Sequence, residues 1–417
     1  MNTPTSKSLP LDACGALLAF DWADKKHDYA FKLSNSQEVK SGVVNNTPKA
    51  VHAFISKLLE SMDGKPVAVI LEQSRGTLVH MLCQHQGLVI YPVNPLTVSN
   101  FRKSFAVSGA KSDQADAAIM LELLEKHHQR LRPLVEESTE TRMLERLVKE
   151  RRQATDERTR CIEQAQAVLK EYYPLALEIL DGDLTTNMAC AFLEKWPEFN
   201  SIKRSQSQTL RKFFYANRSR SETKILQRLE MKERAVALTD DRAVIEPSVY
   251  RVRRLVRQLR ALNTSIAEME TRIDELFASH EDAQIFESLP GAGAALAPRL
   301  LVAIGTDRER WRDANHLSVY SGIAPVIAES GNLSITSFRW TSNKFLRQSF
   351  HEFANYSRQH SKWAGEFYRR RKEKGIKHNT IIRALAFKWL RIIYACWKNR
   401  VPYSAAIADR KFMRNAA

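Results

Sequence analysis

Several features that would place a protein in a well-known class are missing from this sequence. Its five cysteines are scattered and form no C-x-x-C pair, which argues against a zinc site or a disulfide scaffold. The N-terminus has no apolar core of the kind found in a signal peptide, and no uncharged stretch reaches membrane-spanning length. The glycine loops with which a sugar-kinase-type ATPase binds phosphate are also missing. We therefore expect a cytoplasmic protein without a membrane partner.

Acidic residues are outnumbered by basic ones. The 417 residues include 64 lysines and arginines against 47 aspartates and glutamates, a formal net charge of +17. A chain of this length exceeds one ordinary core, and 44% apolar residues can build two or three domains. Such an excess of positive charge favours a polyanionic partner, above all nucleic acid, over a merely solvated surface. Charge alone does not separate RNA from DNA.

The first 133 residues predict a mixed α/β domain. Three strands come first, and helices and strands then alternate, a pattern typical of a mixed sheet covered by helices. Pro48 stands at the favoured first position of the first helix. The expected strands cover residues 15–34 (two strands joined by a charged turn), 37–46, 66–74 and 88–95, and the expected helices cover 47–62, 76–86 and 115–127.

Residues 134–281 predict a long helical region. Apolar residues between 144 and 168 follow a rough heptad spacing, and those between 252 and 276 alternate three and four residues apart without a break, which indicates a coiled-coil seam. The two helices could pair within one chain or across a dimer, or form a charged spacer. Between them, residues 172–246 look like an irregular, basic insertion.

Acidic residues stand at special positions in the first domain. Asp21 closes the buried strand L-L-A-F-D, Glu72 closes A-V-I-L-E, and Asp113 and Asp116 open the last helix. A carboxylate beside a buried strand is costly unless it is paired or bound to metal. Four acids from three rigid elements are what two hard divalent cations need.

Each of these acids also has a purely structural interpretation. Asp21 could be a turn residue, Glu72 could pair with Arg75, and Asp113 or Asp116 could simply favour the start of a helix. The four together, after the strand–strand–strand–helix order, are much harder to explain in that way.

The local strings resemble a known family. F-D-W-A-D-K-K-H, L-E-Q-S-R-G, Y-P-V-N-P and S-G-A-K-S-D-Q-A-D-A are similar to the N-terminal domain of DEDD-type, RuvC-like transposases of bacterial insertion sequences. These are the RNA-guided bridge recombinases, and Piv-type DNA invertases are their relatives. The resemblance implies a ribonuclease H fold and a metal-binding quartet of Asp21, Glu72, Asp113 and Asp116. Ser112 replaces the usual threonine after Lys111.

The C-terminal region, residues 282–403, resembles the second domain of the same transposases. L-P-G-A-G at 289–293 looks like a helix-hairpin-helix turn, whose glycines let backbone N–H groups approach a phosphate. In L-S-V-Y-S-G-I-A-P-V-I-A-E-S-G-N, the family's nucleophilic serine maps to Ser330. Ser321 is a competing serine, which we interpret as structural. Glu329 and Asn332 depart from the family pattern, and S-G-N is also a common turn.

The resemblance thus implies a DNA recombinase that cuts and rejoins strands through a phosphoserine link. It further implies two Mg²⁺ ions, for which Mn²⁺ can substitute, donor and target DNA, a structured non-coding RNA, and a dimer or tetramer in the bacterial cytoplasm near the nucleoid. The alternatives are a RuvC-type nuclease that uses water, a Piv-type invertase, or a non-enzymatic scaffold. Residues expected to contact nucleic acid are Lys111, Gly291, Gly293, Arg339, Lys344 and Arg347. Residues 404–417 look like a tail.

Overall fold

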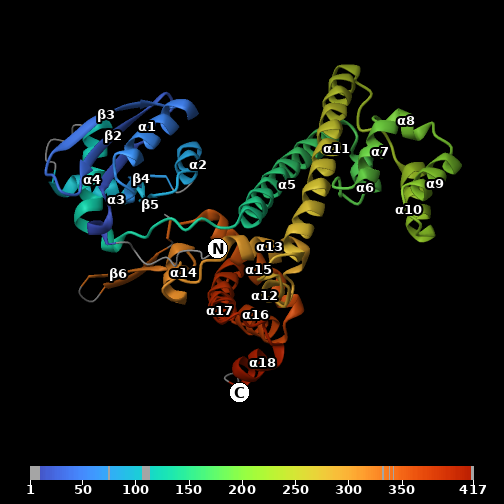
Figure 1. Cartoon of the computed structure of the whole chain (residues 1–417). Coiled ribbons are helices and arrows are strands. Elements are labelled where there is room, and N and C mark those ends of the chain that lie inside the picture. The colour runs from blue at the N-terminus through green and yellow to red at the C-terminus, as the bar shows by residue number, and fades with distance from the viewer. Residues whose placement is uncertain are drawn as a thin grey trace. The chain divides into compact units, whose positions relative to one another are not determined.

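The chain divides into two compact units, residues 1–137 and 138–417. The computed structural model describes residues 10–73, 76–105, 113–330, 333–337, 339–340 and 342–414. The first unit is a mixed α/β domain and the second is mostly helical, so the coarse fold class predicted from sequence is confirmed (Figure 1).

The first unit is built on a five-stranded sheet in the order β3-β2-β1-β4-β5. Strands β1, β2 and β3 form antiparallel pairs, whereas β1, β4 and β5 run parallel. The α3 helix follows Pro92 and was not predicted. The elements are η1 (Leu11–Ala13), β1 (Ala16–Asp21), β2 (Lys26–Leu33), β3 (Val39–Asn45), α1 (Pro48–Glu60), β4 (Val67–Leu71), α2 (Thr77–Cys83), β5 (Leu88–Pro92), α3 (Pro95–Phe105), α4 (Asp113–His127) and η2 (His128–Arg130).

Helices cover both faces of this sheet, because each face carries its own apolar cluster. One face packs against α1 and α2 through residues such as Val51 and Leu78. The other packs against α3 and α4 through residues such as Val98, Met120 and Leu124. Side chains of a strand point alternately to the two faces of the sheet. A residue therefore points to the same face as the residues two positions before and after it.

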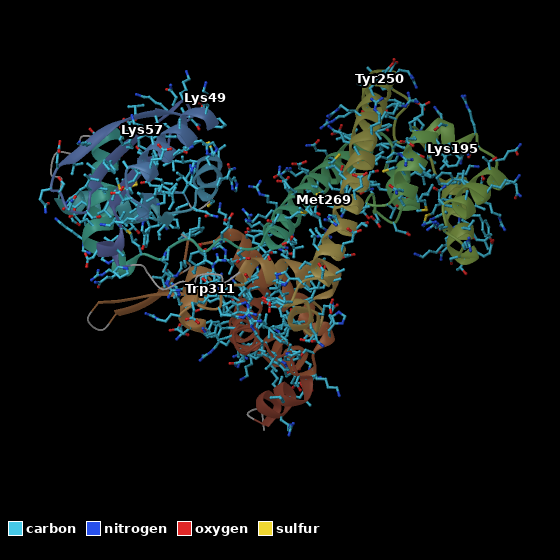
Figure 2. The ribbon with its side chains drawn as sticks, viewed as in Figure 1. Lys49, Lys57, Lys195, Tyr250, Met269 and Trp311 are labelled. Atoms are coloured by element: carbon cyan, nitrogen blue, oxygen red, sulfur yellow. The ribbon has the colours of Figure 1, made fainter. Side chains whose placement is uncertain are left out.

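The second unit begins with two long helices that pack against each other, α5 (Thr139–Tyr172) and α11 (Arg242–Ala278). They run antiparallel within one chain, since Arg151 bonds to Glu270 whereas Cys161 lies against the Leu255 carbonyl. The apolar positions predicted on α11 face inward: Val252, Leu255, Leu259, Ile266, Ile273 and Leu276 are buried. Met269 lies partly exposed on the same helix (Figure 2).

The segment 172–246 is helical, so its interpretation as irregular was wrong. Aromatic residues form its core, among them Phe192, Trp196 and Phe214, and these pack onto α11 through Val252 and Leu255. The Nζ atom of Lys195, a residue labelled in Figure 2, lies 4.8 Å from the centre of the Trp196 ring. The helices are too short to show a periodic pattern: α6 (Pro174–Ile179), α7 (Asn187–Lys195), α8 (Phe199–Lys203), α9 (Ser207–Ala216) and α10 (Glu222–Arg234).

The rest of the second unit packs around Trp389, Trp397, Phe350 and Phe353, all fully buried. Strands β6 and β7 form a two-stranded antiparallel sheet. Residues 405–414 form a helix where the sequence suggested a tail. The elements are α12 (Ala283–Glu287), α13 (Gly293–Ile304), α14 (Ala314–Tyr320), β6 (Val326–Ser330), β7 (Leu333–Ser337), α15 (Lys344–His360), α16 (Lys362–Glu373), α17 (His378–Asn399) and α18 (Ala405–Arg414).

No helix within the described part of the chain combines the length and the apolar character that crossing a membrane requires.

Candidate active site

Two of the predicted acids lie at the ends of neighbouring strands. Asp21 is the last residue of β1, and Glu72 directly follows β4. These strands are parallel neighbours, with Phe20 beside Leu71 in the register. Because adjacent strands are about 4.8 Å apart, the backbones of Asp21 and Glu72 lie side by side at one edge of the sheet. Their predicted positions at strand ends are thereby confirmed.

Both strand ends direct their acids toward the face that α4 covers. Ala19 on β1 and Ile70 on β4 belong to the apolar cluster that includes the α4 residues Ala117 and Met120. Asp21 and Glu72 come two positions after Ala19 and Ile70, so the alternation of a strand gives them that same face. Both residues are partly exposed, as expected at the rim of the sheet.

The α4 helix begins at Asp113, as predicted, and its first turns bring acid to this face. Asp116 is only 5% exposed. Arg102 of α3 lies near it, with its Nη2 atom 2.7 Å from Asp116 Oδ1. The contact is an ion pair without hydrogen-bond geometry, so within the described residues this buried oxygen accepts no hydrogen bond. The side chain of Asp113, like all of Lys111 and Arg75, lies outside the described residues.

The donor chemistry of these residues suits a hard divalent cation. The donors are carboxylate oxygens on two strands and a helix, and one buried oxygen has no hydrogen-bond donor. Within the described part of the chain, no three histidine, cysteine, aspartate or glutamate side chains gather closely enough to hold an ion. That statement does not cover Asp113, the remaining member of the predicted quartet, because its side chain lies outside the described residues.

Ser330 lies in the second unit, as the last residue of β6. It is paired with Leu333 of β7 at the end of the hairpin. Its side chain lies outside the described residues, as do Gly331 and Asn332. The rival Ser321 is fully buried after α14, and its hydroxyl donates to the Ser318 carbonyl, an arrangement expected of a structural serine.

The predicted basic contacts lie after the hairpin. Lys344 is exposed at the first position of α15, and Arg347 lies one turn further on. Arg347 donates to the Arg339 carbonyl at 3.2 Å, so these two residues support each other. Sequence reasoning overlooked Trp340 between them, a large aromatic side chain that is 81% exposed. Exposed aromatic rings beside basic side chains are typical of nucleic-acid surfaces.

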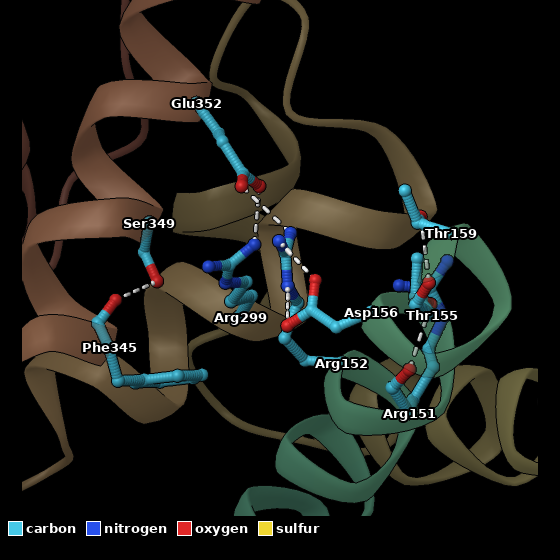
Figure 3. Close-up of polar contacts among 9 residues, drawn as sticks. All are labelled: Arg151, Arg152, Thr155, Asp156, Thr159, Arg299, Phe345, Ser349 and Glu352. Carbon is cyan, nitrogen blue, oxygen red and sulfur yellow. Dashed lines mark hydrogen bonds and ion pairs between the residues drawn. The ribbon is translucent and has the colours of Figure 1, made fainter. Parts of the chain in front are cut away.

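The predicted glycine turn precedes α13 and borders a pocket of about 460 Å³. Gly291 and Gly293 have φ of +82° and +53°, conformations that favour glycine, and a side chain on Gly291 would collide with His360. The pocket also exposes an ion-pair network (Figure 3). In it Glu352 of α15 binds both Arg152 of α5 and Arg299 of α13. Arg152 and Arg299 are therefore paired within the protein, and this ion-pair network joins α5, α13 and α15.

A partly buried histidine lies on α15 near these basic residues. Burial, together with the charges of Arg383 and Arg347, lowers the pKa of His351 to about 4. Its Nε2 atom has no hydrogen-bond partner within the described residues. His351 is therefore neutral at pH 7 and adds no charge to this surface.

Comparisons with known proteins place the two units in one family. A transposase model of the IS110 DEDD type matches residues 18–174, and a model described as transposase IS116/IS110/IS902 family matches residues 283–369. The mini-circle putative transposase for IS117 of Streptomyces coelicolor is 27% identical over 97% of this chain and 99% of its own length. An uncharacterized 42 kDa protein of insertion element IS900 from Mycobacterium paratuberculosis is 25% identical over 92% and 96%. The pilin gene-inverting protein of Moraxella bovis is 29% identical over 36% and 49%.

Both matched domains, in this order, define a transposase, an enzyme that recombines DNA. The chain belongs to the IS110/IS116/IS902 transposase family, as the sequence resemblance predicted.

Proposed function

We propose that this chain cleaves and rejoins DNA strands with a serine nucleophile and divalent cations held by the acids of the first unit. The observation that carries the proposal is the parallel register of β1 and β4. It sets Asp21 and Glu72 side by side, facing the helix that carries Asp113 and Asp116. The strand order and the helices on both faces support a RuvC-like, ribonuclease H fold.

The four carboxylates would hold Mg²⁺, in two sites, with Mn²⁺ as a substitute. A bound cation of this kind polarises a phosphodiester and neutralises charge on the entering and leaving oxygens. The chain's own acids supply the oxygen ligands from rigid strand ends. Asp116 is buried and pairs with Arg102, so a cation bound there would share this carboxylate with the guanidinium.

Ser330 would attack the phosphorus of the scissile phosphodiester. The Oγ–phosphorus bond forms as the bond from phosphorus to a deoxyribose oxygen breaks, and the serine proton is lost to a base or solvent. The products are a phosphoserine link to one strand end and a hydroxyl on the other. The reverse attack by a hydroxyl rejoins strands without external energy. The position of Ser330 at the end of the β6–β7 hairpin supports this role.

DNA is the substrate. We propose that a structured RNA encoded by the element guides the protein to its DNA sites. We further propose that the protein works as a dimer or tetramer and that α5 and α11 form a coiled coil. The net charge of +17 supports polyanionic partners. We propose that the glycine turn at Gly291 and Gly293 is hairpin-like and that it and the basic residues Arg339, Lys344 and Arg347 contact the phosphate backbone. Lys111 would do the same in the first unit.

Site-specific inversion is a second candidate, because 36% of the chain is similar to the pilin gene-inverting protein of Moraxella bovis. Inversion and transposition share the same cutting and joining steps and differ in the arrangement of the DNA sites. The DNA that flanks the gene separates them: an insertion-sequence boundary favours transposition, and an invertible segment favours inversion.

Covalent trapping tests the serine step. Full-length protein is incubated with Mg²⁺, the RNA transcribed beside its gene, and labelled DNA carrying the element's ends, and is then denatured. We expect a protein–DNA adduct that maps to Ser330, is lost in Ser330→Ala, and persists in Ser321→Ala if that variant folds. An adduct that survives Ser330→Ala, or cleavage by the wild type without any adduct, would show that water or another residue attacks.

A further inference from the structure

A fifth carboxylate lies on the α4 face of the sheet, directly opposite Asp21. Asp28 of β2 pairs with Asp21 in the antiparallel register. Four positions along β2, Lys32 forms an ion pair with Glu125 of α4 at 2.5 Å, which shows that this side of β2 faces α4. Since residues four apart in a strand share a face, Asp28 faces α4 as well.

The opening turns of α4 reach the level of Asp28. From Lys32 back to Asp28 the strand rises about 13 Å, at about 3.3 Å per residue. From Glu125 back to Asp116 the helix also rises about 13 Å, at 1.5 Å per residue. Because α4 packs along β1 and β2, these matched distances place the first turns of α4 at the level of the Asp21–Asp28 pair. Asp116 itself lies half a turn around the helix from Glu125 and faces Arg102 of α3.

Asp28 is buried and has no partner of opposite charge. Asp28 is only 5% exposed, yet its carboxylate forms no hydrogen bond or ion pair with any described residue. Two carboxylates directly opposite each other on one face of a sheet repel. Every other buried charged residue that the structure describes has a partner: Lys32 with Glu125, Asp116 with Arg102, Arg228 with Asp181, Lys232 with Glu233, Asp282 with Arg308, and Arg299 with Glu352.

We propose that Asp28 is a ligand of the divalent cation that Asp21 holds, a fifth acid beside the four predicted ones. A cation between the two strands would bind oxygens of both carboxylates and lower the repulsion between them. This inference rests on the proposed function, because it assumes that the metal site lies at this edge of the sheet.

Manganese binding by the full-length protein tests this assignment directly. Free Mn²⁺ is titrated by electron paramagnetic resonance against wild type, Asp28→Asn, and Asp24→Asn, an exposed aspartate of the β1–β2 turn that serves as a matched control. We expect Asp28→Asn to weaken Mn²⁺ binding by at least about tenfold. Asp24→Asn should bind Mn²⁺ like the wild type. Unchanged Mn²⁺ affinity in Asp28→Asn would overturn the proposal.

The melting temperature gives a second test. Replacing an aspartate that only stabilises the fold would change the melting temperature in the opposite direction to that expected for a metal ligand. Without metal, Asp28→Asn should melt at a higher temperature than wild type, because the variant removes a buried, repelled charge. Added Mg²⁺ should then raise its melting temperature less than it raises that of the wild type. A lower melting temperature without metal, with the full Mg²⁺ shift retained, would assign Asp28 to the fold instead.

An Asp21→Asn variant separates this inference from the proposed function. If Asp21→Asn weakens Mn²⁺ binding and Asp28→Asn does not, the inference alone fails. If neither variant changes Mn²⁺ binding, the proposed metal site fails together with it.

Discussion

The two units bury charge differently. In the second unit the buried charged residues that the structure describes each have a protein partner, such as Arg299 with Glu352 and Asp282 with Arg308. In the first unit Asp28 has none among the described residues. The second unit thus neutralises its charges by folding. The first unit retains negative charge that a cation from solution can neutralise. A charge left without a protein partner is typical of a binding site, whereas a paired charge is typical of the fold.

Removing a partner in the second unit should be the most damaging of three charge changes outside the metal site. Glu352→Gln leaves Arg299, which is 4% exposed, without its carboxylate. Burial already lowers the pKa of the Arg299 guanidinium, and Glu352 opposes that effect. We expect a loss of about 3 kcal/mol in the free energy of unfolding, measured in urea. A loss below about 1 kcal/mol would show that this unit does not depend on its internal pairs.

A pH series sharpens the comparison through a histidine that the second unit keeps neutral. Its pKa is about 6.5 in the unfolded chain, and burial beside Arg383 and Arg347 lowers the pKa of His351 to about 4. As pH falls from about 6.5 toward 4, the unfolded state takes up the proton first, so stability is lost across that window. His351→Gln should remove up to about 2 kcal/mol of this loss. Equal pH slopes in both proteins, measured by urea unfolding, would contradict the assignment.

A surface ion pair should have the smallest effect. Arg260 and Glu194 form two hydrogen bonds, but both side chains are about 40% exposed. Solvent screens such pairs, so Glu194→Gln should cost only about 0.5 kcal/mol. The same urea experiment measures it, and the variant is the exposed counterpart of Glu352→Gln. A cost equal to that of Glu352→Gln would remove burial as the cause of the difference.

The parts of the fold that follow a simple period could be predicted from the sequence. Continuous apolar strands ending in acid placed Asp21 and Glu72 at strand ends, and the inward positions of α11 followed from its three-and-four spacing. The α3 helix was missed because Pro92 and Pro95 suggested the end of a strand and gave no sign of a new helix. The β6–β7 hairpin is too short to show an alternating pattern.

The site itself was only partly predictable. Asp113 and Asp116 stand out because they open an apolar helix. Asp28 does not, because it lies in K-H-D-Y-A-F-K-L, where polar residues occur on both faces and the alternation is hidden. Its burial depends on α4, more than eighty residues away in sequence, and only the sheet register places it opposite Asp21. The exposure of Trp340 likewise depends on tertiary packing.

Recombination in cells tests the central claim most directly. A plasmid carrying the element is assayed with wild type, Asp21→Asn, Asp116→Asn and the control Asp24→Asn, with protein levels matched by immunoblot. The account predicts that Asp21→Asn and Asp116→Asn each lower recombination by at least about a thousandfold, because each removes a carboxylate from the cation site. Asp24→Asn should recombine normally. Full recombination by Asp21→Asn or Asp116→Asn would contradict the assignment of the metal site to this edge of the sheet.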